Sequence, residues 1–360
     1  MKRILVLCPY PMGVAPSQRF KFEQYYDDWR SHGWDVEVRP FWDSAAWSSL
    51  YAPGKGIRKT GHLLRGLVRR FLDLPRAFEA DLIYVHLEAA PVGPPLLERL
   101  ISARVPVVYD IDDLVQLPHA SEANPFMRWI RSGDKPFRLM RLAEHVVVCT
   151  EHLKMLAGRE NAKVTNISST IDTEAYIPIL PRARTDEVVV GWSGSHSTSP
   201  YLHLLDEVLL ELQRTDGIRI RVIGDEHYSA PHLEVDALRW RAETEVEDLS
   251  AIDIGVYPLP DQEWVLGKSG LKLLQYMGMG IPAVAERIGT NLEIVQDGVN
   301  GFLARGPEDW SRKIRALVRD PALRGKVGRA GRQTVEARYS VKANASRYRD
   351  VLTAVKGPSR

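Results

Sequence analysis

Two lysines in a glycine-rich segment have the residue types and the spacing that bind phosphate groups. Residues 267–270 read Gly-Lys-Ser-Gly, and Lys272 follows Lys268 by four positions. Glycines let the backbone approach a ligand closely, and the apolar pattern over 271–279 predicts a helix that begins at this point. The N-terminus of a helix carries a partial positive charge, to which each lysine adds a full charge. We therefore predict that Lys268 and Lys272 bind a diphosphate, the alternative being two solvated lysines.

A second glycine turn lies earlier in the chain. Residues 190–201 read as a strand, a glycine turn and the start of a helix among serines. A turn of this kind gathers backbone amides into a nest for an anion. We expect Gly194 and Ser195 to contact the same ligand, the alternative being an ordinary capped turn.

Short apolar runs alternate with helical patterns along the whole chain, which is typical of parallel sheets flanked by helices. Strands are expected at 3–8, 35–40, 82–86, 105–110 and 145–149, and again at 187–192, 219–223, 252–256, 282–285 and 301–303. Helices are expected between them, for example at 19–32 and 94–103. The fold class is therefore α/β.

The chain is long for a single core, since domains usually have roughly 100–200 residues. Pro178 and Pro181 interrupt the periodicity and indicate a linker. We expect an N-terminal domain over 1–180, a second domain over 181–340, and a last helix within 341–360 that crosses back to the first. Ligands of such doubly wound sheets bind at the carboxyl ends of the strands.

The composition excludes several classes of protein. With 48 basic and 46 acidic residues the net charge is only +2, whereas a nucleic-acid-binding domain would be strongly basic. Cys8 and Cys149 both lie in apolar runs, which indicates buried thiols in a cytoplasmic protein. No apolar run reaches the roughly 18 residues of a membrane span.

The second half of the chain resembles a known family. Residues 271–285 and 289–303 are similar to the donor-site signature of glycosyltransferase family four, and the resemblance extends more loosely over nearly the whole chain. These are retaining enzymes of the GT-B architecture, in which two Rossmann-like domains face each other across a cleft. The resemblance implies a nucleotide diphosphate sugar as donor, a hydroxyl acceptor of glycan, lipopolysaccharide or glycolipid assembly, and no metal or other cofactor.

The chain departs from the family at two glutamates. Gln275 stands where the ribose-binding glutamate normally lies, and Gly267 stands where a glutamate contacts the transferred sugar. An amide can still bond a ribose hydroxyl, although it lacks the charge of a carboxylate. We expect Asp261 or Glu263 to replace the first glutamate.

Three polar residues of the first half are expected on the acceptor side. Arg19 follows the first strand, at the position where acceptor and transferred group meet in the resembling family, and would steady charge on the leaving diphosphate; pairing with Glu23 on a helix surface is the alternative. Asp112 and Asp113 follow a first-half strand and would orient acceptor hydroxyls or accept a proton, unless they cap a helix. We do not expect the Asp-x-Asp pattern formed by Asp110 and Asp112 to bind a metal, because lysines can neutralise a diphosphate.

A basic amphipathic stretch predicts a further contact. Between residues 55 and 76 the basic side chains surround apolar pairs such as Leu63 and Leu64; they are Lys55, Arg58, Lys59, Arg65, Arg69, Arg70 and Arg76. An anionic membrane would attract such a stretch, and a solvated helix is the alternative. Membrane contact would make the protein peripheral to the inner face of a membrane, with a lipid-linked acceptor.

We therefore expect a metal-independent glycosyltransferase of the hexosyltransferase type that retains anomeric configuration. Two alternatives stay open. One is a GT-B nucleotide-sugar epimerase or hydrolase, which needs no acceptor. The other is a non-catalytic partner that kept the fold after losing the usual glutamates.

Overall fold

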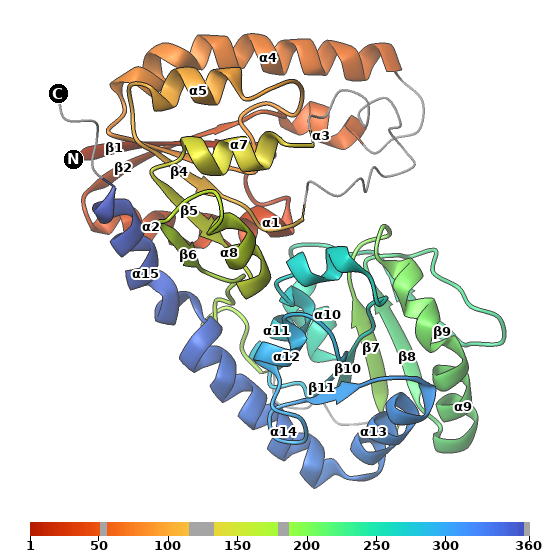
Figure 1. Ribbon diagram of the computed structural model, residues 1–360. Helices are drawn as coiled ribbons and strands as arrows, with labels where there is room; N and C mark the ends of the chain where they lie inside the picture. The colour runs from red at the N-terminus through yellow and green to blue at the C-terminus, as the bar shows by residue number, and fades with distance from the viewer. Residues whose placement is uncertain (51–55, 115–132, 179–186, 356–360) are drawn as a thin grey trace. The chain divides into compact units, whose positions relative to one another are not determined.

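The computed structural model describes residues 1–50, 56–114, 133–178 and 187–355 (Figure 1). The chain divides into two compact units: the first is Met1–Ser169 with Asn344–Arg360, and the second is Thr170–Ala343. The boundary expected near residue 180 falls in 179–186, outside the described residues. Within the described residues, no helix has both the length and the apolar character needed to cross a bilayer.

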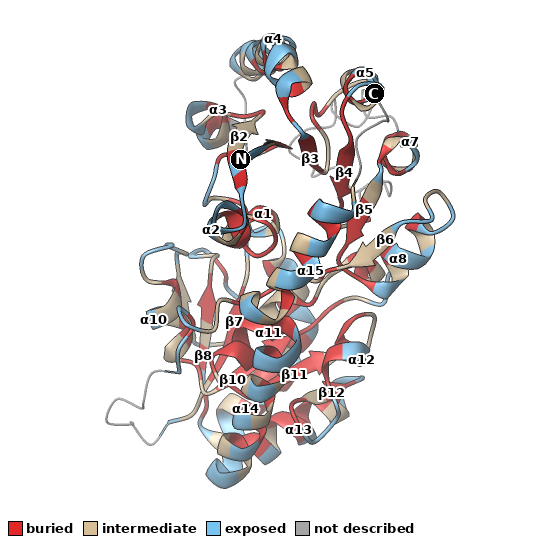
Figure 2. Cartoon of the chain, turned by 90° about the vertical axis from the view of Figure 1, so that its left-hand side faces the viewer, coloured by how far each residue is buried: buried red, intermediate tan, exposed pale blue. Residues whose placement is uncertain are grey.

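The first unit is built on a six-stranded parallel sheet with the strand order β2-β1-β3-β4-β5-β6. Its strands are β1 (Lys2–Cys8), β2 (Trp34–Pro40), β3 (Leu82–His86), β4 (Val107–Asp110), β5 (His145–Val148) and β6 (Val164–Asn166). Its helical segments are α1 (Pro16–Arg19), η1 (Glu23–Tyr25), α2 (Tyr26–Ser31), α3 (Ser44–Leu50), α4 (Gly56–Glu79), α5 (Leu96–Ser102), α7 (Lys135–Leu142), α8 (Glu151–Ala157) and most of α15 (Val341–Ala354). Figure 2 shows β3 and β4 in the colour of buried residues, as expected for strands covered on both faces.

The single helix expected over 19–32 is divided into α1, η1 and α2. Gln18, Phe20, Lys21 and Phe22 are all buried. Successive residues of a regular helix point about 100° apart, so one face of a continuous helix does not bury four residues so closely spaced. The chain breaks the helix so that these side chains all point inward.

Most of helix α15 packs in the first unit. In α15 the ring of Tyr348 lies 4.4 Å from that of Tyr25 and 5.8 Å from that of Trp29, measured between centroids. Arg349 also donates a hydrogen bond to Asp28. These contacts place residues from Asn344 onward with the N-terminal sheet.

The second unit repeats the architecture with the strand order β12-β11-β10-β7-β8-β9, again all parallel. Its strands are β7 (Val189–Ser193), β8 (Arg219–Ile223), β9 (Val235–Leu238), β10 (Ile254–Tyr257), β11 (Ala283–Glu286) and β12 (Phe302–Ala304). Its helical segments are η2 (Ser199–Leu205), α9 (Asp206–Asp216), α10 (Glu245–Ser250), η3 (Glu263–Gly267), α11 (Leu271–Gly278), α12 (Asn291–Ile294), α13 (Pro307–Arg319), α14 (Pro321–Thr334) and η4 (Val335–Tyr339).

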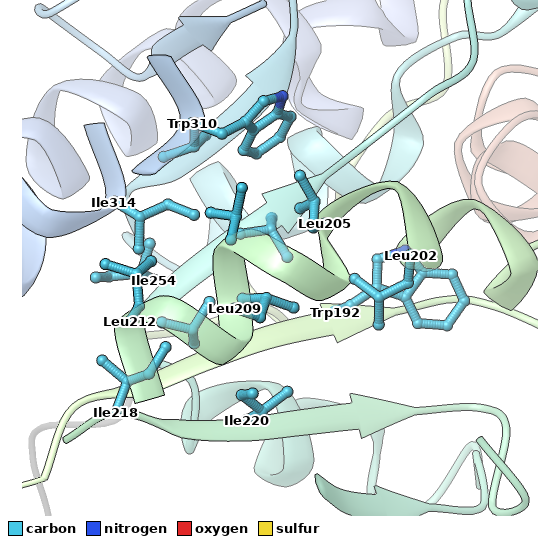
Figure 3. Packing of buried hydrophobic residues seen from close by; sticks show 14 of the residues in the cluster. Trp192, Leu202, Leu205, Leu209, Leu212, Ile218, Ile220, Ile254, Trp310 and Ile314 are labelled. Atoms are coloured by element: carbon cyan, nitrogen blue, oxygen red, sulfur yellow. The ribbon is translucent and has the colours of Figure 1, made fainter. Parts of the chain in front are cut away.

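Apolar side chains of α9 and α13 form a core with the second sheet. Figure 3 shows Leu209 and Leu212 of α9 near Ile254 of β10, with Trp310 and Ile314 of α13 nearby. This core holds β7 and β10 side by side, with Ile254 paired to Val190. The loops that follow these two strands therefore start from a rigid base.

The strand order reverses once in each sheet, between β1 and β3 and between β7 and β10. Loops that leave neighbouring strands in opposite directions open a crevice at such a point, where ligands of α/β sheets bind. The strand order therefore indicates two candidate binding regions. They are the loops after β1 and β3 in the first unit, and the loops after β7 and β10 in the second.

Candidate functional site

Lys272 extends from the first turn of α11 to the turn that follows β7. Its Nζ donates a hydrogen bond to Thr198 Oγ1 at 3.0 Å and lies 4.4 Å from the ring centroid of Trp192 and 5.7 Å from that of Tyr257. In the part of the chain that the structure describes, Lys272 makes no ion pair. Burial, and then the charge of Lys268, lower the pKa of Lys272 to about 7. A cation that lacks a counter-ion and is poorly solvated favours binding of an anion.

Lys268 lies in the loop immediately after η3, two residues before the start of the α11 capping region. Its Nζ is 5.5 Å from the ring centroid of Trp264. The positive charge of Lys268 contributes to lowering the pKa of Lys272, so the two ammonium groups repel each other. Gly270, at the N-cap of α11, has a φ of 73°, and a Cβ there would lie 2.7 Å from Ile294, so only glycine fits this turn.

The turn after β7 does not offer the amide nest that the sequence predicts. The Gly194 amide donates to Ile223 O at 2.9 Å, and the Ser195 amide donates to Thr198 Oγ1 at 3.2 Å. Both amides are therefore already bonded. Gly194 instead makes room, because a Cβ at this position would lie 2.3 Å from Trp192 and 2.6 Å from Lys272 Nζ.

A second glycine allows the backbone to pack closely at this turn. Gly224, just after β8, has a φ of 109°, and a Cβ there would lie 1.8 Å from Gly194 O. The carboxyl ends of β7 and β8 therefore meet backbone to backbone beside Lys272. The residue pattern of β7 or of β8 does not predict this contact, because the contact depends on the order of the strands in the sheet.

Gly224→Ala is expected to destabilise the second unit by roughly 3 kcal/mol, because alanine both resists the positive φ and collides with a backbone oxygen. Gly217→Ala is the matched control: Gly217 also has a positive φ, of 64°, but no atom lies within 4 Å of the added Cβ. Hydrogen exchange of β7 and β8 peptides measures both losses. Equal losses in the two variants would contradict the close approach.

Gln275 lies in a buried polar cluster. Its Nε2 donates to Glu245 Oε1 at 3.0 Å, and Tyr176 OH donates to Glu245 Oε2 at 2.9 Å. A carboxylate thus lies directly beside the amide that stands at the ribose-binding position of the resembling family. Glu245 was missed in the sequence because an acidic residue in the first turn of a helix is usually only a favourable end charge.

The acidic residues expected to replace the first family glutamate lie near η3. Glu263 is the first residue of η3 and is exposed, whereas Gly267, its last residue, is buried. Asp261 is also exposed and pairs with Arg305, with 3.3 Å between Oδ2 and Nη2. Asp261 is therefore already paired with Arg305, and Glu263 is the better candidate to replace the first family glutamate.

The first unit has a fully buried charge cluster at the carboxyl ends of β3 and β4. Asp110 accepts hydrogen bonds from Lys21 Nζ, from Tyr84 OH at 2.9 Å and from His86 Nδ1 at 3.2 Å. Burial alone would raise the pKa of Asp110, but the Lys21 charge holds it below its ordinary value. Lys21 was missed in the sequence, although a lysine between two phenylalanines in an apolar stretch is a recognisable signal.

His86 connects this cluster to the predicted acceptor-side residues. Its Nε2 is buried, lacks a hydrogen-bond partner within the described residues, and lies 4.0 Å from Asp112 Oδ1. Leu87, which follows, has a φ of 56°, a strained value for a residue with a side chain. Strain of this kind persists where the surrounding structure imposes it, as at a binding site.

The three predicted acceptor-side residues differ in their surroundings. Burial raises the pKa of Asp112, while His86 and Lys21 oppose that rise. Asp113 Oδ1 accepts from the Leu114 amide at 2.8 Å, and the helix that it would cap lies outside the described residues. Arg19 ends α1 with its guanidinium 5.0 Å from the ring centroid of Phe20. Within the described residues no cluster of three or more histidine, cysteine or acidic side chains is arranged for a metal.

Comparison with known proteins identifies the segment that carries the lysine site. Residues 187–320 match the family model for glycosyl transferases group 1. This segment is therefore similar to group 1 glycosyl transferases. The matched segment contains every residue predicted to bind the donor: Gly194, Ser195, Glu263, Lys268, Lys272 and Gln275.

Curated relatives match short parts of the chain. A sucrose synthase from Thermosynechococcus vestitus is 37% identical over 84 residues, which are 22% of this chain and 10% of that protein. A D-inositol 3-phosphate glycosyltransferase from Arthrobacter sp. (strain FB24) is 41% identical over 63 residues, 17% of this chain and 15% of that protein. The aligned segments thus span only a small part of the length of these relatives.

Solved structures match over nearly the whole chain. HepE from Anabaena, crystallised with UDP and glucose, has a TM-score of 0.66 at 18% identity and covers 99% of this chain and 100% of its own. Sucrose-phosphate synthase from Thermosynechococcus elongatus has a TM-score of 0.67 at 15% identity, with 98% and 100% covered. These matches confirm the predicted α/β fold of the GT-B type.

Proposed function

We propose that this protein is a glycosyltransferase that transfers a sugar from a nucleotide diphosphate donor to a hydroxyl acceptor. The observation that carries the proposal is Lys272, a poorly solvated cation without a counter-ion among the described residues, held by Thr198 at the end of β7 within the segment similar to group 1 glycosyl transferases. A diphosphate would supply the missing negative charge. The structural likeness to HepE, which was crystallised with UDP-glucose, supports a nucleotide sugar as the donor.

The leaving diphosphate gains negative charge as the bond to the sugar breaks. Lys272 and Lys268 would stabilise that charge electrostatically, and the fixed turn after β7 would hold Lys272 in place without rearrangement. Gln275, together with Glu245, would bind hydroxyls of the nucleotide ribose. We assign Arg19, Asp112 and Asp113 to the acceptor side, with His86 beside Asp112, and we propose retention of configuration.

The setting that we propose is cytoplasmic, with a hydroxyl acceptor of glycan, lipopolysaccharide or glycolipid assembly. Cys8 and Cys149 are both buried free thiols, which suits a reducing compartment. A lipid-linked acceptor would bring the protein to the inner face of a membrane.

Product analysis with a panel of nucleotide sugars, UDP-glucose first, tests the proposal. We expect release of the nucleotide diphosphate that depends on an added hydroxyl acceptor. Release of free sugar without acceptor would indicate a hydrolase, and an altered sugar still attached to its nucleotide would indicate an epimerase. A thermal shift without any turnover would indicate a non-catalytic protein, because binding alone stabilises the folded state.

Donor binding is expected to take up a proton above neutral pH. At about pH 8, one unit above the pKa of Lys272, roughly nine-tenths of the free side chain is neutral, and a bound diphosphate would raise that pKa and recharge it. Affinity for UDP-glucose should therefore fall as the pH rises above about 7. Calorimetry in two buffers of different ionisation enthalpy measures the protons taken up.

Lys272→Met should abolish the proton uptake, because both phosphates of the donor are esters and do not titrate near neutral pH. Lys268→Ala should reduce the uptake, because losing the Lys268 charge raises the pKa of free Lys272. Uptake that is unchanged in Lys272→Met would assign the titration to another group and remove this support for the lysine site.

A further inference from the structure

The outer side of α4 exposes large apolar side chains. Ile57 is 94% exposed, Leu64 57%, Val68 58%, Phe71 60% and Leu72 66%. Their spacing places them along one stripe of the helix. The solvent side of a helix in a globular protein is normally polar, so a continuous apolar stripe indicates a surface that meets another apolar phase.

The orientation of α4 is fixed by its opposite side. Arg70 is buried and donates to Ala89 O at 2.7 Å and to Cys8 O at 3.0 Å. Gly66 lies so close to Phe41 that a Cβ would come within 2.6 Å of its ring. Arg70, which the sequence places in the basic stretch, therefore belongs to the interior, and Lys55 lies outside the described residues. The exposed stripe is the side of α4 that remains.

The neighbouring helix α5 extends this surface. Leu96 and Leu100 are exposed on α5, and Leu97 packs with Leu63 and Leu67 of α4 around one small core. Arg104, just beyond α5, places its guanidinium 4.5 Å from the ring centroid of Phe78 on α4. Much of α4 has the colour of exposed residues in Figure 2. We call the exposed apolar side chains of these two helices, with Arg58, Arg99 and Arg104, the α4–α5 surface.

The α4–α5 surface has an excess of positive charge. Arg58, Arg99 and Arg104 are exposed and make no ion pair with any described residue. Arg65 and Arg69 share Asp43, at 3.8 Å and 3.0 Å, and Glu79 is the exposed acid of α4. Apolar side chains beside unpaired arginines match the chemistry of an anionic lipid headgroup layer. A second copy of this chain would instead bring the same arginines together.

We propose that the α4–α5 surface docks on an anionic lipid bilayer. The leucines, Val68 and Phe71 enter the boundary between headgroups and acyl chains, and Arg58, Arg99 and Arg104 contact lipid phosphates. The exposed stripe from Ile57 to Leu72 is about 22 Å long at the rise of an α-helix. A straight, outward-facing stripe of that length fits a flat bilayer rather than a groove. The docking does not depend on the proposed sugar transfer.

Co-sedimentation of the full chain with lipid vesicles tests the docking. We expect binding to vesicles of phosphatidylcholine with phosphatidylglycerol, little binding to phosphatidylcholine alone, and weaker binding as salt is added. Phe71→Ser with Leu72→Ser should lower partitioning at least tenfold. Arg58→Ala with Arg99→Ala should lower it about fivefold per arginine.

Leu292→Ser and Arg159→Ala are matched controls, because both residues are exposed and lie outside the α4–α5 surface. They should leave vesicle binding unchanged, and equal melting temperatures would show that all variants fold. Failure of the wild-type chain to bind the anionic vesicles, or unchanged binding in the Phe71/Leu72 variant, would overturn the proposal. Sedimentation velocity could also show a dimer of the wild-type chain that dissociates in the Phe71/Leu72 variant. That result would assign the surface to contact with a second copy and would also overturn the proposal.

Thermal shift with UDP-glucose on the same variants separates this proposal from the proposed function. The docking variants should keep the shift of the wild-type chain while losing vesicle binding. Vesicle binding by a chain that binds no nucleotide sugar would leave the docking intact and contradict the transferase.

Discussion

Lys272→Ala is expected to lower kcat with the correct donor and acceptor about 10²–10³-fold, the usual loss when one charge-stabilising group is removed. The ammonium group is held by Thr198 and lies over Trp192, so it is in place before the substrate binds. A neighbouring lysine compensates only in part, because Lys268 lies over a different ring, that of Trp264. Lys268→Ala should therefore also lower kcat, but by less.

The same substitution is expected to stabilise the second unit. A lysine whose pKa falls to about 7 binds fewer protons in the folded state than in the unfolded state between that pH and its ordinary value near 10.5. Burying this charge therefore destabilises the folded state at neutral pH. Lys272→Ala should raise the free energy of unfolding by roughly 1–3 kcal/mol. The gain should be full at neutral pH and below, and should shrink as the pH rises toward 10.5.

Steady-state kinetics and hydrogen exchange of β7 peptides measure the two effects of Lys272→Ala. Lys326→Ala is the matched control, because Lys326 is an exposed lysine of the same unit. Lost turnover together with gained stability is the signature of a group retained for function rather than for folding. An unchanged kcat would exclude Lys272 from the proposed diphosphate site.

Lys21→Met is expected to destabilise the first unit by about 3–5 kcal/mol at neutral pH, because it leaves Asp110 as an uncompensated buried charge. Both side chains are 0% exposed, and Asp110 also accepts from Tyr84 and His86. The two remaining donors do not replace a full positive charge. The loss should shrink as the pH falls, because Asp110 without Lys21 becomes protonated at a higher pH and is then neutral.

Hydrogen exchange of β3 and β4 peptides measures this loss in the first unit alone. Lys21→Met combined with Asp110→Asn should recover most of the lost stability, since no buried charge then remains unpaired. Lys154→Met is the control, because Lys154 forms an exposed ion pair with Glu151 and should contribute little. A loss below about 1 kcal/mol in Lys21→Met would show that the cluster is solvated or otherwise compensated.

Most strands were predictable from their apolar runs, and two edge strands were not. The runs at 82–86 and 219–223 match β3 and β8 residue for residue. β3 is buried along its whole length, and β8 buries Ile220, Val222 and Ile223. β6 and β9 were missed, because both are only partly buried and lack a continuous apolar run. The other two edge strands, β2 and β12, were predicted at 35–40 and 301–303.

The amino-acid sequence by itself determined the α/β class, the repeated strand-helix layout and the glycine-lysine segment, because each is written in neighbouring residues. Only the tertiary structure decided which distant residues meet. Lys272 and Thr198 are 74 residues apart, Lys21 and Asp110 are 89 apart, and Gln275 and Glu245 are 30 apart. Local periodicity reports which residues are buried, but the order of strands in the sheet determines which loops are neighbours, and no local pattern encodes that order.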